Sequence, residues 1–288
     1  MKVRISPRFP LVWRSPDAIQ LGTARPRIVV DDVDDGIDRL LTALVRGDTV
    51  ERAVATAVRH GTSATRAAEV AALVAPTLEP APGAERRRAP AEAVVDPAGF
   101  TLRGTTPITV PLLAAFAEHG AAPTREPLTA GSRDLLVVAA HYVVAPSTYL
   151  PLLADDRPHL AVTLEDRIAI AGPLVVPGRT PCIRCDDLYR RDRDGTWPTV
   201  ATQLVHRRSP LDDPAILRQT ADTLVRLALP YLVADEVPEG DAAARIDAVT
   251  GSSRRRPRRF HDECGCRALP RIAIPVDPRR GTRRVGPS

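Results

Sequence analysis

The chain has 288 residues, enough for about two domains that each bury a core of their own. Its 44% hydrophobic and 26% charged residues are typical of a folded globular protein and exclude a disordered or fibrous one. The formal net charge is +5, and Lys2 is the only lysine, so arginine supplies nearly all of the positive charge.

The sequence contains no apolar stretch of the roughly 20 residues that a membrane-spanning helix needs. The longest apolar run, Leu135 to Ala140, stops at His141, and the N-terminus MKVRISPRFPLVW lacks the apolar core of an export signal. We therefore expect a cytoplasmic protein with no membrane partner.

The first 75 residues predict a small winged-helix-like module. Three short apolar segments between Leu11 and Val30 are separated by turn residues, which is typical of a meander of strands. Apolar residues at helical spacing then predict three helices, the last from about Ser63 to Ala75, where Pro76 ends it.

A linker and a second domain are expected to follow. Residues 76–97 are rich in Pro, Ala and charge without an apolar period, which indicates a linker. In residues 98–270, apolar strand-like segments alternate with helical ones and predict a parallel, Rossmann-like sheet. RIAIAGPLVVPG, from Arg167, predicts two short strands broken at Gly172-Pro173, and Asp212 to Leu229 predicts a helix.

The excess positive charge gathers in RRRPRR, from Arg254 to Arg259, and in the tail from Arg271 to Arg284. Such runs can contact nucleic acid or an acidic partner. We favour the simpler interpretation, a solvated loop followed by a disordered basic tail over 271–288, and expect no nucleic-acid partner.

The strongest chemical signal is the pairing of all four cysteines. Cys182 and Cys185 form a CxxC turn, and Cys264 and Cys266 form a CxC pair far along the chain. Two such pairs complete a tetrahedral thiolate shell, which favours a structural zinc ion with no open coordination position. A redox-active pair or two disulfides are the alternatives, and His261 is a possible substitute for one thiolate.

Several longer segments resemble a known superfamily. DLLVVAAHYVV from Asp134, GPLVVPGRTPCIRC, the DRD-x-x-WP motif from Asp192 to Pro198 and HDECGC from His261 to Cys266 are similar to the ThiF/MoeB branch of the E1-like activating enzymes. The similarity is greatest to actinobacterial cyclodehydratase-like, leader-peptide-binding proteins of azoline-forming peptide modification. The resemblance implies an N-terminal winged-helix peptide-recognition module, an E1-type domain with zinc, and a homodimer.

The groups that such enzymes need to adenylate a carboxylate are missing here. The expected Gly-rich phosphate turn is Gly104-Thr105-Thr106-Pro107-Ile108-Thr109, with one glycine and a proline that removes a donor. The ATP-binding lysine is absent, and neither Arg103 nor Arg125 stands at a motif position. The magnesium-handling acid aligns with Ala140-His141-Tyr142, so ATP with magnesium is not expected and no catalytic residue is assigned.

Other polar residues near these motifs have a structural and a functional interpretation. His141 is a replacement ligand or base, or simply a histidine at the end of a strand. The acidic residues of DDLYRRDRD also have two interpretations. They are either magnesium ligands or, as we favour, members of a solvated, internally paired helix face. These residues are Asp186, Asp187, Asp192 and Asp194.

The sequence thus predicts a non-catalytic scaffold that binds a leader peptide and presents it to a partner modifying enzyme in thiazole- or oxazole-type peptide biosynthesis. The peptide would add a strand near Arg27 to Val30, beside the third predicted helix. One alternative is an active ThiF-like adenylyltransferase. A second is a winged-helix DNA-binding regulator, although the third helix offers only Arg66 against Glu69.

Overall fold

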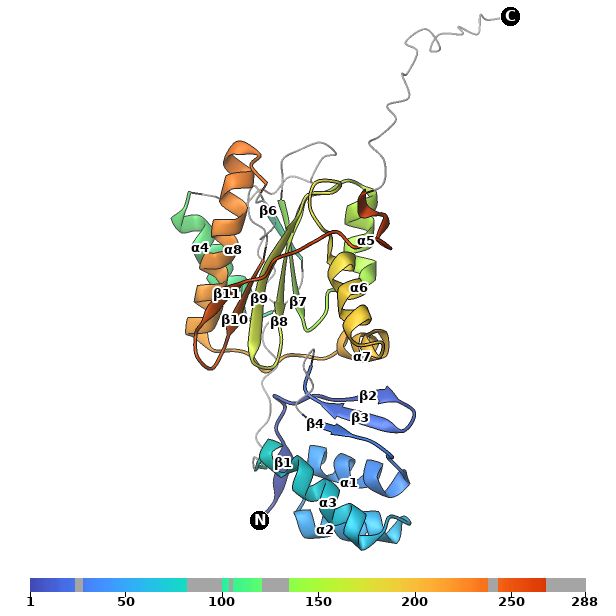
Figure 1. Cartoon of the computed structure of the whole chain (residues 1–288). Coiled ribbons are helices and arrows are strands. Elements are labelled where there is room, and N and C mark those ends of the chain that lie inside the picture. The colour runs from blue at the N-terminus through green and yellow to red at the C-terminus, as the bar shows by residue number, and fades with distance from the viewer. Residues whose placement is uncertain (24–27, 82–99, 104–105, 121–134, 238–242, 268–288) are drawn as a thin grey trace, which may run out of the picture.

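The N-terminal part of the chain is a small antiparallel sheet packed on three helices (Figure 1). We describe a computed structural model, which covers all residues except 24–27, 82–99, 104–105, 121–134, 238–242 and 268–288. The sheet has the order β2-β3-β4, with strands β2 (Leu11–Ser15), β3 (Ala18–Leu21) and β4 (Ile28–Val30). The expected meander of three strands is therefore confirmed.

Each of the three N-terminal helices begins at a residue whose side chain caps it. Asp34, Thr49 and Ser63 each accept a hydrogen bond from the backbone N–H three residues on, which satisfies a donor that the helix leaves free. The helices are α1 (Asp35–Arg46), α2 (Val50–Arg59) and α3 (Ala64–Val74). Their apolar faces share one core with β3 and β4.

The N-terminal unit extends beyond residue 76, where the linker was expected to begin. A short helix, η1 (Ala75–Thr77), leads into β5 (Leu78–Pro80), which pairs antiparallel with β1 (Val3–Ile5). Arg4 and Glu79 form an ion pair across these strands at 2.6 Å. Residues 82–97 of the expected linker lie outside the described residues.

The second unit contains a six-stranded sheet of order β11-β10-β9-β8-β7-β6. Only β6 (Phe100–Arg103), β7 (Leu135–His141) and β8 (His159–Leu164) run parallel. The antiparallel strands are β9 (Ile168–Val175), β10 (Ala244–Asp247) and β11 (Ser253–Arg255). The prediction of a parallel sheet is wrong for this half, since the short turn between β8 and β9 cannot hold the crossover that parallel strands require.

The predicted break at Gly172-Pro173 is an irregularity within a single strand, because β9 continues through it while its register with β8 shifts between Leu160 and Val162. Helices cover both faces of the sheet (Figure 1). One face packs against α4 (Thr109–Glu118) and α8 (Pro214–Ala234), and α8 continues five residues beyond the predicted end at Leu229. The other face packs against α5 (Pro146–Ala154) and α6 (Ile183–Arg193).

The two units meet through β2 and the helix α7 (Trp197–Leu204). Val12 of β2 is fully buried in an apolar cluster with Trp197 and Leu204 of α7 and with Tyr142. No helix in the described part of the chain is long and apolar enough to cross a bilayer.

Candidate functional site

The four cysteines converge as the sequence predicts. Cys182 is the N-cap of α6 and Cys185 lies in its first turn, whereas Cys264 and Cys266 flank the start of a short helix, η2 (Gly265–Arg267). All four Sγ atoms lie within 4.8 Å of one another, and all four thiols are free. In the described part of the chain, this is the only such group of three or more candidate metal ligands.

The distances between the sulfur atoms fit one tetrahedral ion. Sulfur ligands about 2.3 Å from a tetrahedral ion lie about 3.8 Å from one another. The Cys182–Cys264, Cys185–Cys266 and Cys182–Cys185 sulfur separations are 3.6, 3.5 and 3.9 Å. The cluster can therefore hold a metal ion, and four thiolates would leave no position for water.

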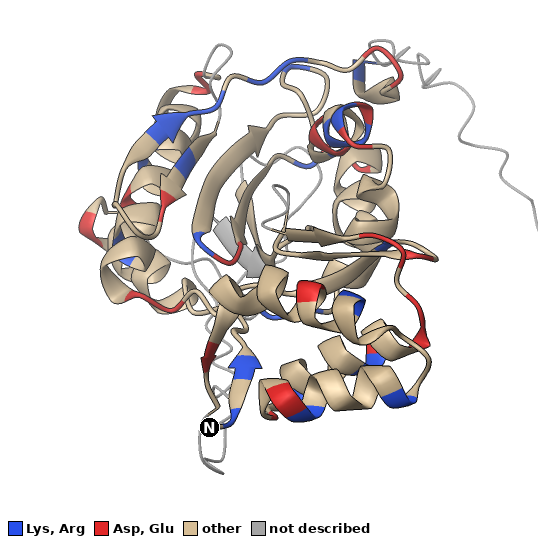
Figure 2. Cartoon of the chain, turned by 60° about the horizontal axis from the view of Figure 1, so that its bottom comes forward, with Lys and Arg blue, Asp and Glu red and all other residues tan. Residues whose placement is uncertain are grey.

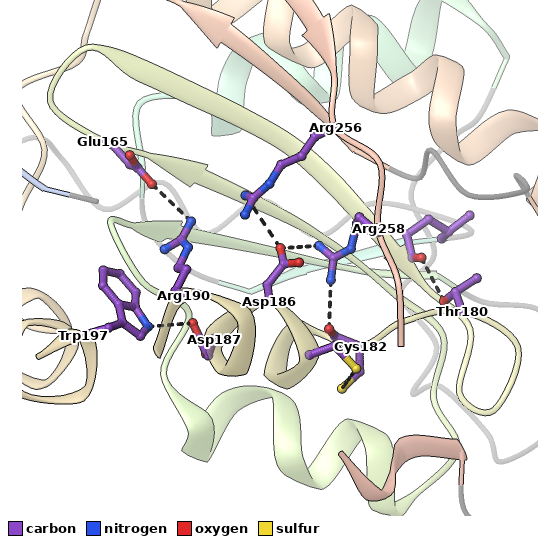
Figure 3. A network of polar contacts seen from close by, with 11 residues as sticks. Glu165, Thr180, Cys182, Asp186, Asp187, Arg190, Trp197, Arg256 and Arg258 are labelled. Atoms are coloured by element: carbon purple, nitrogen blue, oxygen red, sulfur yellow. Dashed lines mark hydrogen bonds and ion pairs between the residues drawn. The ribbon is translucent and has the colours of Figure 1, made fainter. Parts of the chain in front are cut away.

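A buried arginine joins the C-terminal segment to α6 beside this cluster (Figure 3). The Arg258 guanidinium donates to Asp186 Oδ2 at 2.6 Å and to the Cys182 carbonyl at 2.8 Å. Its side chain is only 1% exposed, and that of Asp186 is 18% exposed. Arg256 approaches the same carboxylate less closely, at 3.7 Å.

His261 lies near the cysteines and is engaged elsewhere. Its Nε2 is 2.7 Å from Asp192 Oδ2, its Nδ1 accepts from the Glu263 N–H, and its ring meets Tyr189 edge-on. The hydrogen bond with His261, together with Arg191, holds the pKa of Asp192 below its ordinary value. The candidate ligand set thus consists of the four cysteines alone.

The acidic residues that could have held magnesium do not come together. Asp186 pairs with Arg258, and Asp187 accepts from the Trp197 indole at 3.4 Å. Asp194 pairs with Arg14 of β2 at 2.9 Å. Each of these carboxylates therefore has its own donor, but the donors lie outside DDLYRRDRD. The interpretation of an internally paired face is wrong for these three, and only Asp192 pairs within the segment, with Arg191 at 2.7 Å.

The carboxyl end of β7 carries the residues with which the expected magnesium-handling acid aligns. His141 Nδ1 accepts from the Ser209 N–H, and the Tyr142 side chain is buried at a left-handed backbone position. The phosphate-turn residues Gly104 and Thr105 lie outside the described residues, as does Arg125, and nothing is described of the Arg103 side chain.

Two acidic residues that directly follow β8 were not among the candidates predicted from the sequence. Glu165 is 3% exposed, lies 3.4 Å from the Arg190 guanidinium, and accepts from Thr23 of the N-terminal unit at 3.4 Å. Burial raises the pKa of its neighbour Asp166 to about 6. An acidic pair directly after a buried strand was the available signal, because strand ends in α/β sheets commonly carry functional groups.

The two outer edges of the N-terminal sheet differ. On β2, the Gln203 amide of α7 accepts from the Trp13 N–H at 2.9 Å and donates to the Trp13 carbonyl at 2.8 Å. This side chain occupies the edge as a further strand would. On the opposite side, β4 pairs only with β3 in the described part of the chain, and α3 packs beside it.

Comparisons with known proteins give a distant structural likeness. No protein-family model matches the sequence, and no curated protein matches it. A heterocyclase in complex with substrate and cofactor is 16% identical, with a TM-score of 0.45, over 92% of this chain and 39% of that one. The heterocyclase TruD is 18% identical, with a TM-score of 0.41, over 91% and 42%.

A chain of the E. coli microcin synthetase McbBCD complex is 12% identical, with a TM-score of 0.42, over 91% of this chain and 99% of that one. The present chain thus spans about two fifths of the two heterocyclases. At these identities and TM-scores, the likeness does not establish a function for this chain.

Proposed function

We propose that this chain binds an extended peptide along β4 and presents it to a separate peptide-modifying enzyme. The observation that carries the proposal is the asymmetry of the N-terminal sheet: Gln203 covers the β2 edge, whereas β4 has no second partner strand among the described residues. An open antiparallel edge offers main-chain donors and acceptors to an added strand, which is a common mode of peptide recognition.

Side chains near β4 would give such binding its selectivity. Ile28 and Val30 face the core of the N-terminal unit, and Val29 points to the opposite face together with its cross-strand partner Gln20. Leu73 of the neighbouring helix α3 is 45% exposed. A peptide strand beside β4 would place alternate side chains on the two faces of the sheet.

Residues 1–81 would then be the recognition domain, with residues from 100 onward as its scaffold. We propose zinc as the ion of the cysteine cluster, because four thiolates at tetrahedral separations form a structural zinc site. When bound, zinc would supply a cross-link between its ligands and no reactive water. Cys182 and Cys185 would hold α6, and Cys264 and Cys266 would hold the C-terminal segment against it.

We further propose that the chain does not adenylate a carboxylate itself. The adenylating enzymes that the sequence resembles carry a magnesium-handling acid at the end of the strand that aligns with β7. Here that position has His141, hydrogen-bonded to Ser209, and the buried ring of Tyr142. Of the two carboxylates that directly follow β8, Glu165 is already paired with Arg190. The resemblance of the cysteine-containing motifs to azoline-forming systems supports peptide natural-product biosynthesis as the setting.

A peptide-binding experiment tests the recognition role. The full chain, captured with peptides from its host, should enrich a small precursor peptide. The synthetic peptide should then slow amide hydrogen exchange in residues 28–30 while leaving 11–15 unchanged. N-methylation of alternate peptide amides should abolish binding, because it removes main-chain donors. Protection that appears elsewhere and leaves β4 unchanged would refute the proposal.

Two biochemical measurements test the remaining parts. The purified chain should contain one zinc ion, and a Cys185→Ser variant should lose it and unfold at lower temperature, because metal binding is coupled to folding. ATP–pyrophosphate exchange should stay at background with the captured peptide present. Exchange above background would restore the adenylyltransferase alternative, whereas a metal-free wild-type chain of normal stability would contradict the zinc proposal.

A further inference from the structure

A cavity of about 410 Å³ lies where the two units meet, and neither the zinc site nor β4 accounts for it. Gln20 and Thr23 from the β3 side of the N-terminal sheet form one wall. Residues of β9, β10, α6 and α7 form the others, so the cavity exists only with the units docked as they are here. We call it the arginine cavity.

The walls of the arginine cavity are strongly basic. Four arginines line it, against Asp194 as the one acidic residue of the lining. They are Arg190, Arg193, Arg245 and Arg256. Asp194 is already paired with Arg14 at 2.9 Å, which cancels its charge.

Two of these arginines are paired and two are not. Arg190 contacts Glu165 at 3.4 Å, and Arg256 shares Asp186 with Arg258 (Figure 3). Arg193 and Arg245 form no ion pair among the described residues. Arg245 lies within electrostatic reach of Asp247, but that carboxylate also interacts with Arg167. The cavity therefore keeps an excess of positive charge that an anion would neutralise.

The sheet concentrates further positive charge on this face. Arg245 of β10 lies directly opposite Arg254 of β11. Arg256 comes two residues after Arg254, so its side chain is on the same face. Like charges opposite each other in antiparallel strands are destabilising. Figure 2 shows the basic residues of these strands at the rim of the second unit. An anion near this row would relieve their repulsion.

The lining also includes an apolar surface. Ile168, Ile170 and Val200 line the cavity beside Trp197, and the Arg190 guanidinium lies 4.6 Å from the centre of the Trp197 ring. Stacking on the indole holds this guanidinium with its donors in a fixed plane. Planar guanidinium groups beside apolar side chains suit a carboxylate carried on a short hydrocarbon stem.

We propose that the arginine cavity binds an acidic side chain of a peptide, and so selects peptides with Asp or Glu close to the segment held at β4. This inference rests on the proposed function. Gln20 lies on β3, next to β4, so a strand added to β4 would run about 10 Å from it. Glutamate side chains on the Val29 face of that strand point toward the second unit.

Trp197 provides a direct reporter, because the chain has only two tryptophans. In the full chain carrying Trp13→Phe, the single remaining indole N–H signal in an NMR spectrum belongs to Trp197. Titration with hexaglutamate should shift this signal, whereas hexaglutamine should not. Added salt should weaken the binding, because the attraction is ionic. Inorganic pyrophosphate is titrated separately to detect phosphate binding.

Variants in the same background identify the contacts. Arg193→Ala and Arg245→Ala should each weaken hexaglutamate binding about tenfold, the effect of losing one charge-assisted hydrogen bond. Arg208→Ala removes an exposed arginine outside the lining and should leave binding unchanged. An unmoved Trp197 signal, equal loss in all three variants, or a response to pyrophosphate alone would overturn the proposal.

The two proposals fail in different ways. If peptide protects β4 from exchange but hexaglutamate leaves Trp197 unchanged, the arginine cavity is refuted and peptide recognition stands. If hexaglutamate binds at Trp197 but no peptide protects β4, the recognition role is refuted, and so is the proposed coupling of the cavity to β4.

Discussion

Arg258→Met should destabilise the chain far more than the same change at the neighbouring Arg256. The Arg258 side chain is 1% exposed and bonds both Asp186 and the Cys182 carbonyl, whereas Arg256 is 24% exposed and 3.7 Å from the same carboxylate. Removing one partner of a buried ion pair costs about 3–5 kcal/mol, because the other charge is left without its partner.

The residual contact with Arg256 and the 18% exposure of Asp186 place the expected loss near the lower limit, at about 3 kcal/mol. Arg256→Met should cost under about 1 kcal/mol, as exposed and distant ion pairs do. Methionine is used because it preserves most of the apolar stem of arginine.

Equilibrium unfolding in urea measures both losses, with bound metal quantified in each sample. A third variant, Asp186→Asn, and its combination with Arg258→Met complete a double-mutant cycle, in which we expect a clear coupling energy. Equal, small losses in the two arginine variants would refute the assignment of Arg258 as the buried link. So would a cycle with no coupling.

Three further predictions concern other contacts. Asp166→Asn should stabilise the chain by about 1–2 kcal/mol at pH 8 and not at pH 4: burial raises the folded pKa to about 6, so the wild type loses stability as the pH rises through that value. Urea unfolding at the two pH values measures this, and a pH-independent difference would contradict it. Gln203→Ala should cost about 1–2 kcal/mol and speed amide exchange at Trp13, since both backbone groups lose their partner; unchanged exchange would exclude the edge-capping role. Asp34→Ala should cost about 1 kcal/mol at pH 7 by thermal unfolding, as N-cap losses do. Hydrogen bonds from Thr62 and the Ile37 N–H lower the pKa of Asp34, so this advantage should disappear as the pH falls below about 4, and a difference that persists there would argue against the cap.

The local structure and the convergence of the four cysteines could be predicted from the sequence, because both depend on short residue spacings. The N-terminal helices show an apolar period of 3.6, and the spacing of Cys182 and Cys185 indicates a shared ion. The antiparallel pairing of β8 and β9 could be predicted too, since only Glu165 to Arg167 separate the two strands. The apparent alternation of strands and helices elsewhere in this unit instead favours a parallel sheet.

Features that depend on distant contacts could not be predicted in this way. Nothing near Gln203 indicates that its amide meets Trp13 across 190 residues. The arginine cavity likewise needs α6 and β10, which are separated by residues 194–243, to face one another. The Gly172-Pro173 pair is ordinarily a local sign of a turn, and here it produces an irregularity in the pairing of β9 with β8 within one continuous strand.

The Gln203 contact also sets a limit on assembly. Because this amide blocks the β2 edge of the three-stranded sheet, a further strand can be added to that sheet only at the β4 edge. Two copies that met through their β4 strands would saturate each other, so such association would stop at a pair and could not lengthen into a fibre. The same edge would be unavailable to a ligand while the pair persisted, and self-association would therefore compete with recognition.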